Sequence, residues 1–570
     1  MNRISINQTL LAKSLFVLLV AITALLLGRP AMTGAKDANK QPVKTSSSSE
    51  AKSTDSLPGE LAHQINSTID SSEFAYARWG ISVISLTNGT VVYQRDADKL
   101  FTPASNMKIY TTGVALDLLG ADYRWRTSLF ASAEPDAAGR VRGDLILYGR
   151  GAPDLVANSN DGSKGSLSGL ADQLYQKGIR RIDGNVIGDE SYFRGNPIGD
   201  GWLWTDLQWY FGAEASALSI NGNEVDVNIV PSDKSSEPPA VRVSNAQANV
   251  VVQNRMALAD KEGRPTVGLH RGLSDNNLEV WGEFTPASKG FGARLSVHDP
   301  ALWAARLFVE ALKARGIAVS GDAQSRNARA PQDARFDPMK STELAFVNSQ
   351  PLSDIAKRTN KESVNLSAEL ILRTLGRERR EMAGGPEPPG RERGDDEAGL
   401  AVVRVWLSRN AVPSTHIALH DGSGLSRLDL VTPESSARLL VAMSKTASAG
   451  VFKDSLPIAG RDGTLASRLQ NLSDRVWAKT GSLTYNNSLA GYMTTANGEL
   501  LAFSIMCNDH TGRGASTRLI DQIVELVGGV SPKFGRKTRK TLVKPAPAAN
   551  VSPRQTMLNH VLLPVPPAAA

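Results

Sequence analysis

The chain has 570 residues, of which 41% are hydrophobic and 21% charged, and its formal net charge is +7. This length and composition suit two or three folded domains and exclude a wholly disordered protein. The single cysteine, Cys507, excludes an intrachain disulfide and lies in an apolar run, which predicts a buried, unreactive thiol.

The first 35 residues have the layout of a signal peptide. Arg3 and Lys13 precede an apolar run over 15–27, and small residues follow it. The run is short for a membrane-spanning helix, so cleavage is favoured over retention as an anchor. We therefore expect an exported protein, in the periplasm.

Both ends of the mature chain look unstructured. Residues 36–58 offer almost nothing to bury and predict a disordered tether, and 531–570 predict a disordered, basic, Pro/Ala-rich tail. The basic excess is ordinary for a soluble protein. It also fits attraction to an anionic wall polymer or peripheral association with a membrane face. We expect no nucleic-acid partner.

The residue pattern, in hydrophobic periodicity and in the frequency of Gly, Asn, Asp and Pro, divides the folded part into an α/β domain and a β-rich insertion. A hairpin is predicted over 81–93, and a helix opens at Pro103. Short β-like runs broken by Gly, Asn, Asp and Pro fill the next 200 or so residues, with one helix at 300–316. Helices then return. A largely helical run is expected over 353–375, a charged Gly/Pro surface loop over 376–399, and a second hairpin over 488–507. We expect an α/β (α+β) catalytic domain from 59–122 and 330–530, interrupted by a β-rich insertion of one or two subdomains at 123–329.

The first candidate catalytic motif is Ser105-Asn106-Met107-Lys108 at the predicted helix start. Residues three apart share one helix face, so Lys108 can reach the Ser105 hydroxyl. A neutral lysine can remove the serine proton, and burial or a second cation would lower its pKa enough. The motif alone is weak, because Ser-x-x-Lys recurs by chance; residues 49–52 repeat it in the tether.

The second motif, Ser363-Val364-Asn365, is the least certain of the three because a plain polar helix surface explains it equally well. The literal string Ser-Asp-Asn occurs at 274–276. We prefer 363–365 because it adjoins a helical run of the catalytic domain. Ser363 is the candidate proton relay, and the Asn365 amide is the candidate holder of Lys108 and of substrate.

The third motif is Lys479-Thr480-Gly481-Ser482 at a strand end. Lys479 and Thr480 suit a substrate carboxylate, as a charge and a hydroxyl donor. Gly481 admits close approach to the strand, and the Ser482 N–H can serve an oxyanion beside that of Ser105. An exposed strand end is the alternative interpretation.

Together, and in this order, the motifs resemble the signature of penicillin-recognising serine acyl-transferases. The chain is similar to low-molecular-mass class C penicillin-binding proteins, the D-alanyl-D-alanine carboxypeptidase/endopeptidase family. The resemblance covers roughly residues 60–530, and the longer strings that carry it are 101–108, 188–193, 212–219, 421–427 and 456–465.

The resemblance implies cleavage of peptidoglycan stem peptides or cross-links through a Ser105 acyl-enzyme, with β-lactams as inhibitors and no cofactor or metal. Val364 departs from the Asp common in the family, at a position that is not catalytic.

Three alternatives remain. The fold could serve a β-lactamase or an esterase, or a non-catalytic wall-binding protein. A Ser-His-Asp hydrolase would draw on His298-Asp299 or His420-Asp421, but the chain has no Gly-x-Ser-x-Gly.

Overall fold

A computed structural model describes residues 56–159, 165–232, 237–259, 266–284, 288–329, 335–511 and 516–529. The predicted signal peptide, nearly all of the predicted tether and the basic tail lie outside these residues. The last three tether residues begin helix α2 (Ser56–Asp70). No helix in the described ranges is long and apolar enough to cross a membrane.

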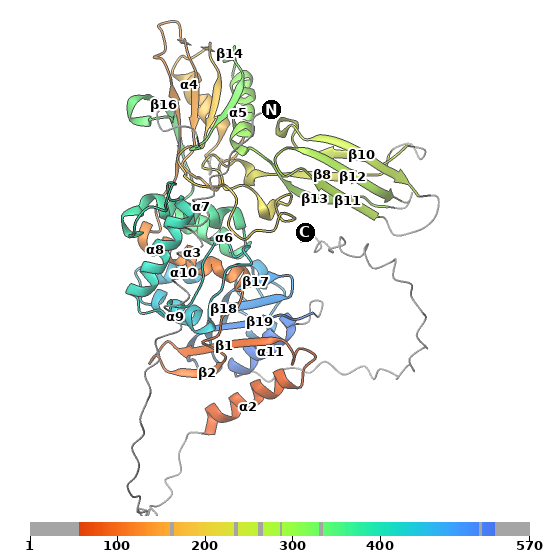
Figure 1. Cartoon of the computed structure of the whole chain (residues 1–570), viewed down its shortest axis with the longest axis vertical. Coiled ribbons are helices and arrows are strands. Elements are labelled where there is room, and N and C mark those ends of the chain that lie inside the picture. The colour runs from red at the N-terminus through yellow and green to blue at the C-terminus, as the bar shows by residue number, and fades with distance from the viewer. Residues whose placement is uncertain are drawn as a thin grey trace, which may run out of the picture. The chain divides into compact units, whose positions relative to one another are not determined.

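The catalytic domain is built on a five-stranded sheet that joins two distant parts of the chain (Figure 1). Each predicted hairpin forms, and β1 pairs antiparallel with β19 from Arg78↔Asn508 to Ser85↔Leu501. In order across the sheet the strands are β17 (Val476–Leu483), β18 (Asn486–Thr494), β19 (Leu500–Asn508), β1 (Arg78–Ser85) and β2 (Val91–Arg95).

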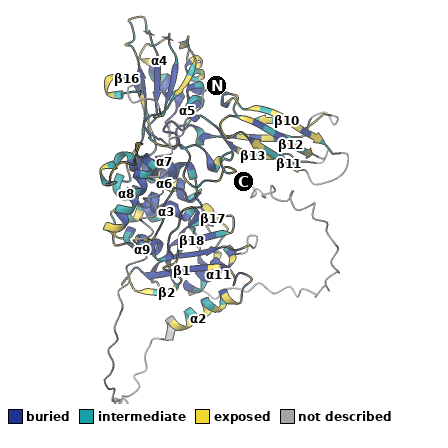
Figure 2. Cartoon of the chain, in the orientation of Figure 1, coloured by how far each residue is buried: buried dark blue, intermediate teal, exposed yellow. Residues whose placement is uncertain are grey.

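Helices cover both faces of this sheet, which is why β1 is buried along nearly all its length. On one face α2 and α11 (Ser516–Val527) pack on alternate strand residues such as Ile81 and Val83. On the other face α9 (Pro433–Met443) contacts β1 and β19. Figure 2 accordingly shows the central strands of this sheet in dark blue, as buried, along most of their length.

Helix α3 (Met107–Leu119) lies at the centre of a helical layer, and its first ten residues are all buried. Four helices complete this layer: α6 (Leu352–Lys361), α7 (Asn365–Glu378), α8 (Asp395–Arg409) and α10 (Ala449–Ser455). Because α3 is enclosed, the polar side chains that it carries must find partners inside the protein.

The strands of the insertion form two groups of sheets, which we call its first and second subdomains, and the second has a hydrophobic core of its own. The first has a five-stranded sheet, flanked by α4 (Leu167–Gln176) and α5 (Pro300–Ala314), with strand order β15 (Ala323–Arg326), β7 (Val186–Asp189), β5 (Leu145–Tyr148), β3 (Arg126–Ala131) and β16 (Thr342–Asn348). A small sheet lies beside it, in the order β14 (Ala318–Val319), β6 (Arg181–Ile182) and β4 (Arg140–Val141). Strand β16 pairs with β3 although it follows the predicted boundary at 330, so this sheet takes one strand from beyond that point.

The second subdomain packs two three-stranded sheets around Val227, Leu278 and Leu295. One sheet has the order β13 (Phe291–Ser296), β8 (Glu224–Val230) and β9 (Ala240–Val243). The other has the order β10 (Val251–Leu258), β12 (Asn277–Phe284) and β11 (Thr266–Arg271).

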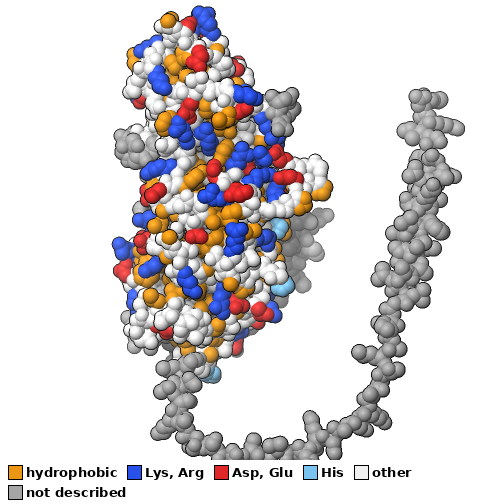
Figure 3. Space-filling model, turned by 90° about the vertical axis from the view of Figure 1, so that its left-hand side faces the viewer, with side chains coloured by type: hydrophobic (Ala, Val, Ile, Leu, Met, Phe, Trp, Pro, Cys, Tyr) orange, Lys and Arg blue, Asp and Glu red, His pale blue; other side chains and the backbone are white. Residues whose placement is uncertain are grey.

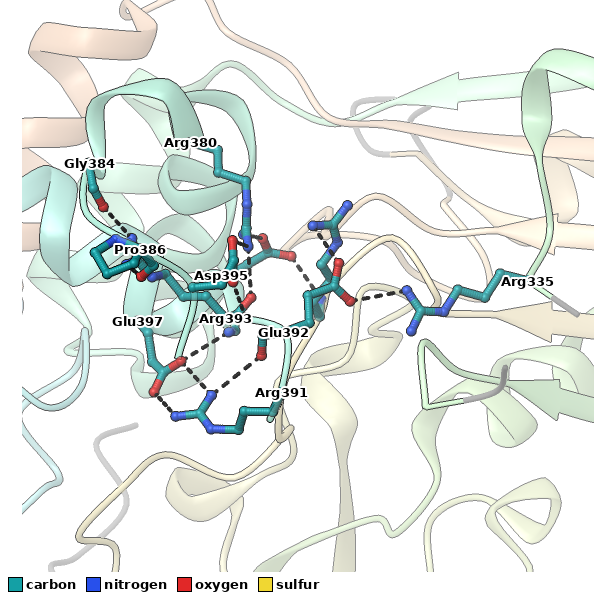
Figure 4. A network of polar contacts seen from close by, with 12 residues as sticks. Arg335, Arg380, Gly384, Pro386, Arg391, Glu392, Arg393, Asp395 and Glu397 are labelled. Atoms are coloured by element: carbon teal, nitrogen blue, oxygen red, sulfur yellow. Dashed lines mark hydrogen bonds and ion pairs between the residues drawn. The ribbon is translucent and has the colours of Figure 1, made fainter. Parts of the chain in front are cut away.

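The charged Gly/Pro segment expected as a loop over 376–399 is shorter in the structure, because α7 continues to Glu378 and α8 begins at Asp395. Ion pairs fix what remains (Figure 4). Arg391 pairs with Glu397, and Arg380 pairs with Asp395. Opposite charges six and fifteen residues apart thus order a stretch that has little to bury.

Candidate active site

Ser105 lies on a short 3-10 helix, η1 (Ala104–Asn106), which leads into α3. Ala104 has a φ of +49°, so the chain turns sharply just before the serine, which is half-buried. A β-carbon on Gly481 would stand 2.6 Å from the carbonyl oxygen of Pro103 and 3.1 Å from Asn106 N. Only glycine at 481 therefore lets β17 approach the serine this closely.

Lys108 lies one turn further on and is fully buried. Its Nζ is 3.0 Å from Ser105 Oγ and donates to Asn365 Oδ1 (2.6 Å) and to the carbonyl of Ser423 (2.8 Å). Burial lowers the pKa of Lys108 to about 7, against the opposing pull of Asp421 and Glu369. A large fraction of this amine is therefore neutral near pH 7.

Ser363 faces the third motif from the break between α6 and α7. It has a φ of +60°, and its Oγ accepts a hydrogen bond from Lys479 Nζ at 2.9 Å. Lys479 also donates to the carbonyl of Thr480 (2.7 Å) and is fully buried. Burial, and then the nearby Lys108, hold the pKa of Lys479 well below its usual value.

The rest of the third motif lines the same place. Thr480 Oγ1 donates to Thr464 Oγ1 at 2.7 Å, and Ser482, which is exposed, accepts from Asn487 Nδ2 at 3.0 Å. The three motifs thus meet through hydrogen bonds and the η1–β17 approach. The competing string at 274–276 instead bonds within the insertion, where Asn276 donates to His298 O.

Sequence reasoning missed the groups behind Lys108. Ser423 acts through its backbone carbonyl, which no side-chain pattern reveals. Glu369 lies one turn after Asn365 on α7, and its Oε1 accepts from Gly422 N (3.0 Å) and Ser423 N (2.8 Å). Burial and Asp421 raise the pKa of Glu369 to about 8. Its i, i+4 spacing from Asn365 was the available signal.

The histidines on which the alternative Ser-His-Asp arrangement would draw have other partners. His298 Nδ1 is 2.5 Å from Glu214, and His420 Nδ1 is 2.8 Å from Asp200. Both partners are carboxylates of the insertion. In the described ranges no cluster of His, Cys, Asp and Glu is arranged to hold a metal ion.

A lysine, rather than a histidine, thus adjoins the Ser105 hydroxyl, on the fold of penicillin-recognising enzymes. Residues 61–529 match the D-Ala-D-Ala carboxypeptidase 3 (S13) family. The chain belongs to this family, and it is a low-molecular-mass class C penicillin-binding protein and a serine carboxypeptidase.

Known relatives agree with this assignment. A D-alanyl-D-alanine carboxypeptidase of Actinomadura sp. (strain R39) is 31% identical over 497 residues, covering 84% of this chain and 87% of its own. The D-alanyl-D-alanine carboxypeptidase DacB of Haemophilus influenzae is 28% identical over 442 residues, covering 76% of this chain and 85% of its own. The crystal structure of penicillin binding protein 4 from the same organism matches with a TM-score of 0.68 and 25% identity, covering 83% of this chain and 99% of that one.

Proposed function

We propose that Ser105 attacks the carbonyl carbon of the penultimate D-alanine of a peptidoglycan stem peptide or cross-link. Neutral Lys108 takes the Ser105 proton across the 3.0 Å that separate Nζ from Oγ. This contact, with Lys108 buried, is the observation that supports the proposal most directly. The acyl-enzyme ester on Ser105 Oγ is then hydrolysed by water.

The remaining motif residues bind the charged groups of the substrate and transfer a proton. The backbone N–H groups of Ser105 and Ser482 bind the oxyanion. Ser363, in contact with Lys479, passes a proton to the leaving amine. Thr480 and Lys479 bind the terminal carboxylate, and Asn365 orients both Lys108 and the peptide.

Labelling the purified chain with a fluorescent penicillin, beside Ser105→Ala, tests the nucleophile. We expect one label per wild-type chain and none on the variant, because a β-lactam carbonyl meets the same hydroxyl. Incubation with cross-linked muropeptides, read by mass, tests the substrate: loss of one D-alanine indicates carboxypeptidase action, and cleaved dimers indicate endopeptidase action. A wild type that takes no label would favour a wall-binding protein, and rapid release of hydrolysed penicillin would favour a β-lactamase.

A periplasmic location, supported by the signal-like N-terminus, completes the proposal. Peripheral association through the basic charge is a separate possibility. On the face of the folded part drawn in Figure 3, cations and carboxylates are interspersed rather than gathered in one patch. The basic tail is the other candidate for such association, and removing residues 531–570 before measuring vesicle binding tests it.

A further inference from the structure

The direction in which Lys108 points its lone pair is set by two hydrogen-bond acceptors. A neutral amine has two N–H bonds and one lone pair. Asn365 Oδ1 (2.6 Å) and the carbonyl of Ser423 (2.8 Å) can only accept, so they take both N–H bonds. The lone pair is then left for the hydroxyl of Ser105 at 3.0 Å. Moving either acceptor would turn the base away from the nucleophile.

The insertion holds the first of these acceptors. Asn365 Nδ2 donates to the carbonyl oxygen of Phe211 at 2.9 Å. If the amide turned over, it would present N–H to Lys108 and a carbonyl to another carbonyl, and both hydrogen bonds would be lost. The backbone at 211 therefore selects the orientation in which Asn365 offers oxygen to Lys108.

The insertion also holds the turn that carries the second acceptor. Trp202 Nε1 donates to Asp421 Oδ2 at 2.8 Å. The same carboxylate accepts from Gly424 N (2.6 Å) and Ser426 N (2.8 Å), on either side of the turn that follows Ser423. Asp421 is 1% exposed. The N–H groups of Gly424 and Ser426 come from its own turn, whereas the indole of Trp202 comes from the insertion.

We propose that the segment 202–211 of the insertion is a positioning element for the general base, with Trp202 as its decisive side chain. The proposal rests on the proposed role of Lys108. It gives the insertion a part in acyl transfer itself: one segment of about ten residues steadies both acceptors that aim the amine.

The test compares Trp202→Phe with Trp204→Phe in the full chain. Phenylalanine keeps an apolar ring at 202 but has no N–H, whereas Trp204 is 65% exposed in the same segment and is the matched control. The measurement is the second-order rate of acylation by a fluorescent penicillin between about pH 5.5 and 9, with thermal unfolding of each variant. Trp202→Phe should acylate about tenfold more slowly, as expected when a hydrogen bond to a charged group is lost, and Trp204→Phe should match wild type.

The pH profile separates positioning from general damage. The charged groups facing Lys108 are Glu369 on α7, Asp421 on the turn and Lys479 on β17. In Trp202→Phe the turn still holds the Asp421 carboxylate, but the indole N–H no longer compensates part of its charge. The carboxylate then attracts the Lys108 ammonium more strongly, so the rising limb of the Trp202→Phe profile should move to higher pH. Trp202→His, which retains a ring N–H, should recover most of the rate.

Equal rates in Trp202→Phe and wild type would overturn the proposal. So would a slower Trp202→Phe whose rising limb is unmoved and whose loss only tracks a lower melting temperature. If Trp202→Phe does not fold, Trp202→His decides. The proposal fails if the folded Trp202→His variant is acylated about tenfold more slowly than Trp204→Phe. Failure of the proposed function is distinct, because wild type would then take no label or Ser105→Ala would still be labelled.

Discussion

At the scale of residues, the site depends on two buried lysines whose neighbours act in opposite directions. Burial favours a neutral Lys108, while Asp421 and Glu369 favour its charged form. Lys108 in turn disfavours the charge on Lys479. The protein thus keeps one amine near the pH at which it can both take and return a proton.

Glu369→Gln tests the electrostatic part of this balance. The amide oxygen can still accept from Gly422 N and Ser423 N, so the turn should stay in place. Glu369 carries its charge chiefly above its pKa of about 8, so removing the carboxylate should favour neutral Lys108 in that range and move the upper part of the rising limb of the acylation profile to lower pH, with the plateau rate changed less than about threefold. An unmoved limb, measured with the same penicillin, would mean that Glu369 exerts no charge effect on the base.

Lys108 should also affect how the free energy of unfolding depends on pH. Its folded pKa of about 7 lies below the ordinary lysine value of 10.5, so the unfolded chain binds the extra proton between these values and stability rises with pH there. Glu369, with a pKa of about 8, acts oppositely below that pH. Urea unfolding at about pH 8 and 9.5 should therefore show a rise that is smaller in Lys108→Met, by up to about 1.4 kcal/mol per pH unit. An identical rise in both proteins would contradict a depressed lysine.

Residues with a side-chain signature could be read from the sequence, and those acting through the backbone could not. Short motifs contain Ser105, Lys108 and Lys479, and the residue types and spacing of these motifs indicate the roles that we propose. The carbonyl of Ser423 has no such mark. It becomes relevant only when the chain folds the turn at 421–426 against Lys108, which is a matter of tertiary structure.

At the scale of elements, local patterns predicted the hairpins and the helix α5 because each depends on neighbours in sequence. The helical run expected over 353–375 is instead two helices, α6 and α7, separated at Ser363. A positive φ at a non-glycine residue costs roughly 1 kcal/mol or more. The break persists here because it brings Ser363 to Lys479, and no local preference foretold it.

The approach of β17 to η1 predicts the effect of Gly481→Ala. The added β-carbon would stand 2.2 Å from Ser488 Oγ and 2.6 Å from Pro103 O, so β17 and the serine must separate. We expect the acylation rate to fall by about 100-fold or more, because a displacement of the reacting groups of about 1 Å has an effect of this size. Gly450→Ala, which meets no atom within 4 Å on α10, is the control. A Gly481→Ala enzyme as fast as this control would show that the contact does not position the site.

At the scale of the whole molecule, the catalytic sheet depends on segments from both sides of the insertion. Strand β19 lies between β18 and β1, so it pairs with an early and a late strand at once. The serine and the two lysines cannot meet unless that pairing is complete. The pairing of β16 with β3 was hidden from the sequence, because pairing between strands so far apart leaves no local trace.

Cys507 reports on this pairing, because it is the chain's single cysteine and lies on β19 with no exposed surface. Burial raises the pKa of its thiol to about 12, so it should react negligibly with a thiol reagent in the native protein. In rising urea, we expect thiol labelling to appear over the same concentrations at which penicillin labelling of Ser105 disappears. Both signals require β19 to leave its two neighbours, and Cys507→Ser, followed by penicillin alone, controls for damage by the reagent. Thiol labelling well before the loss of penicillin labelling would show that the site survives without the intact sheet, and would contradict the dependence of catalysis on the β1–β19 junction.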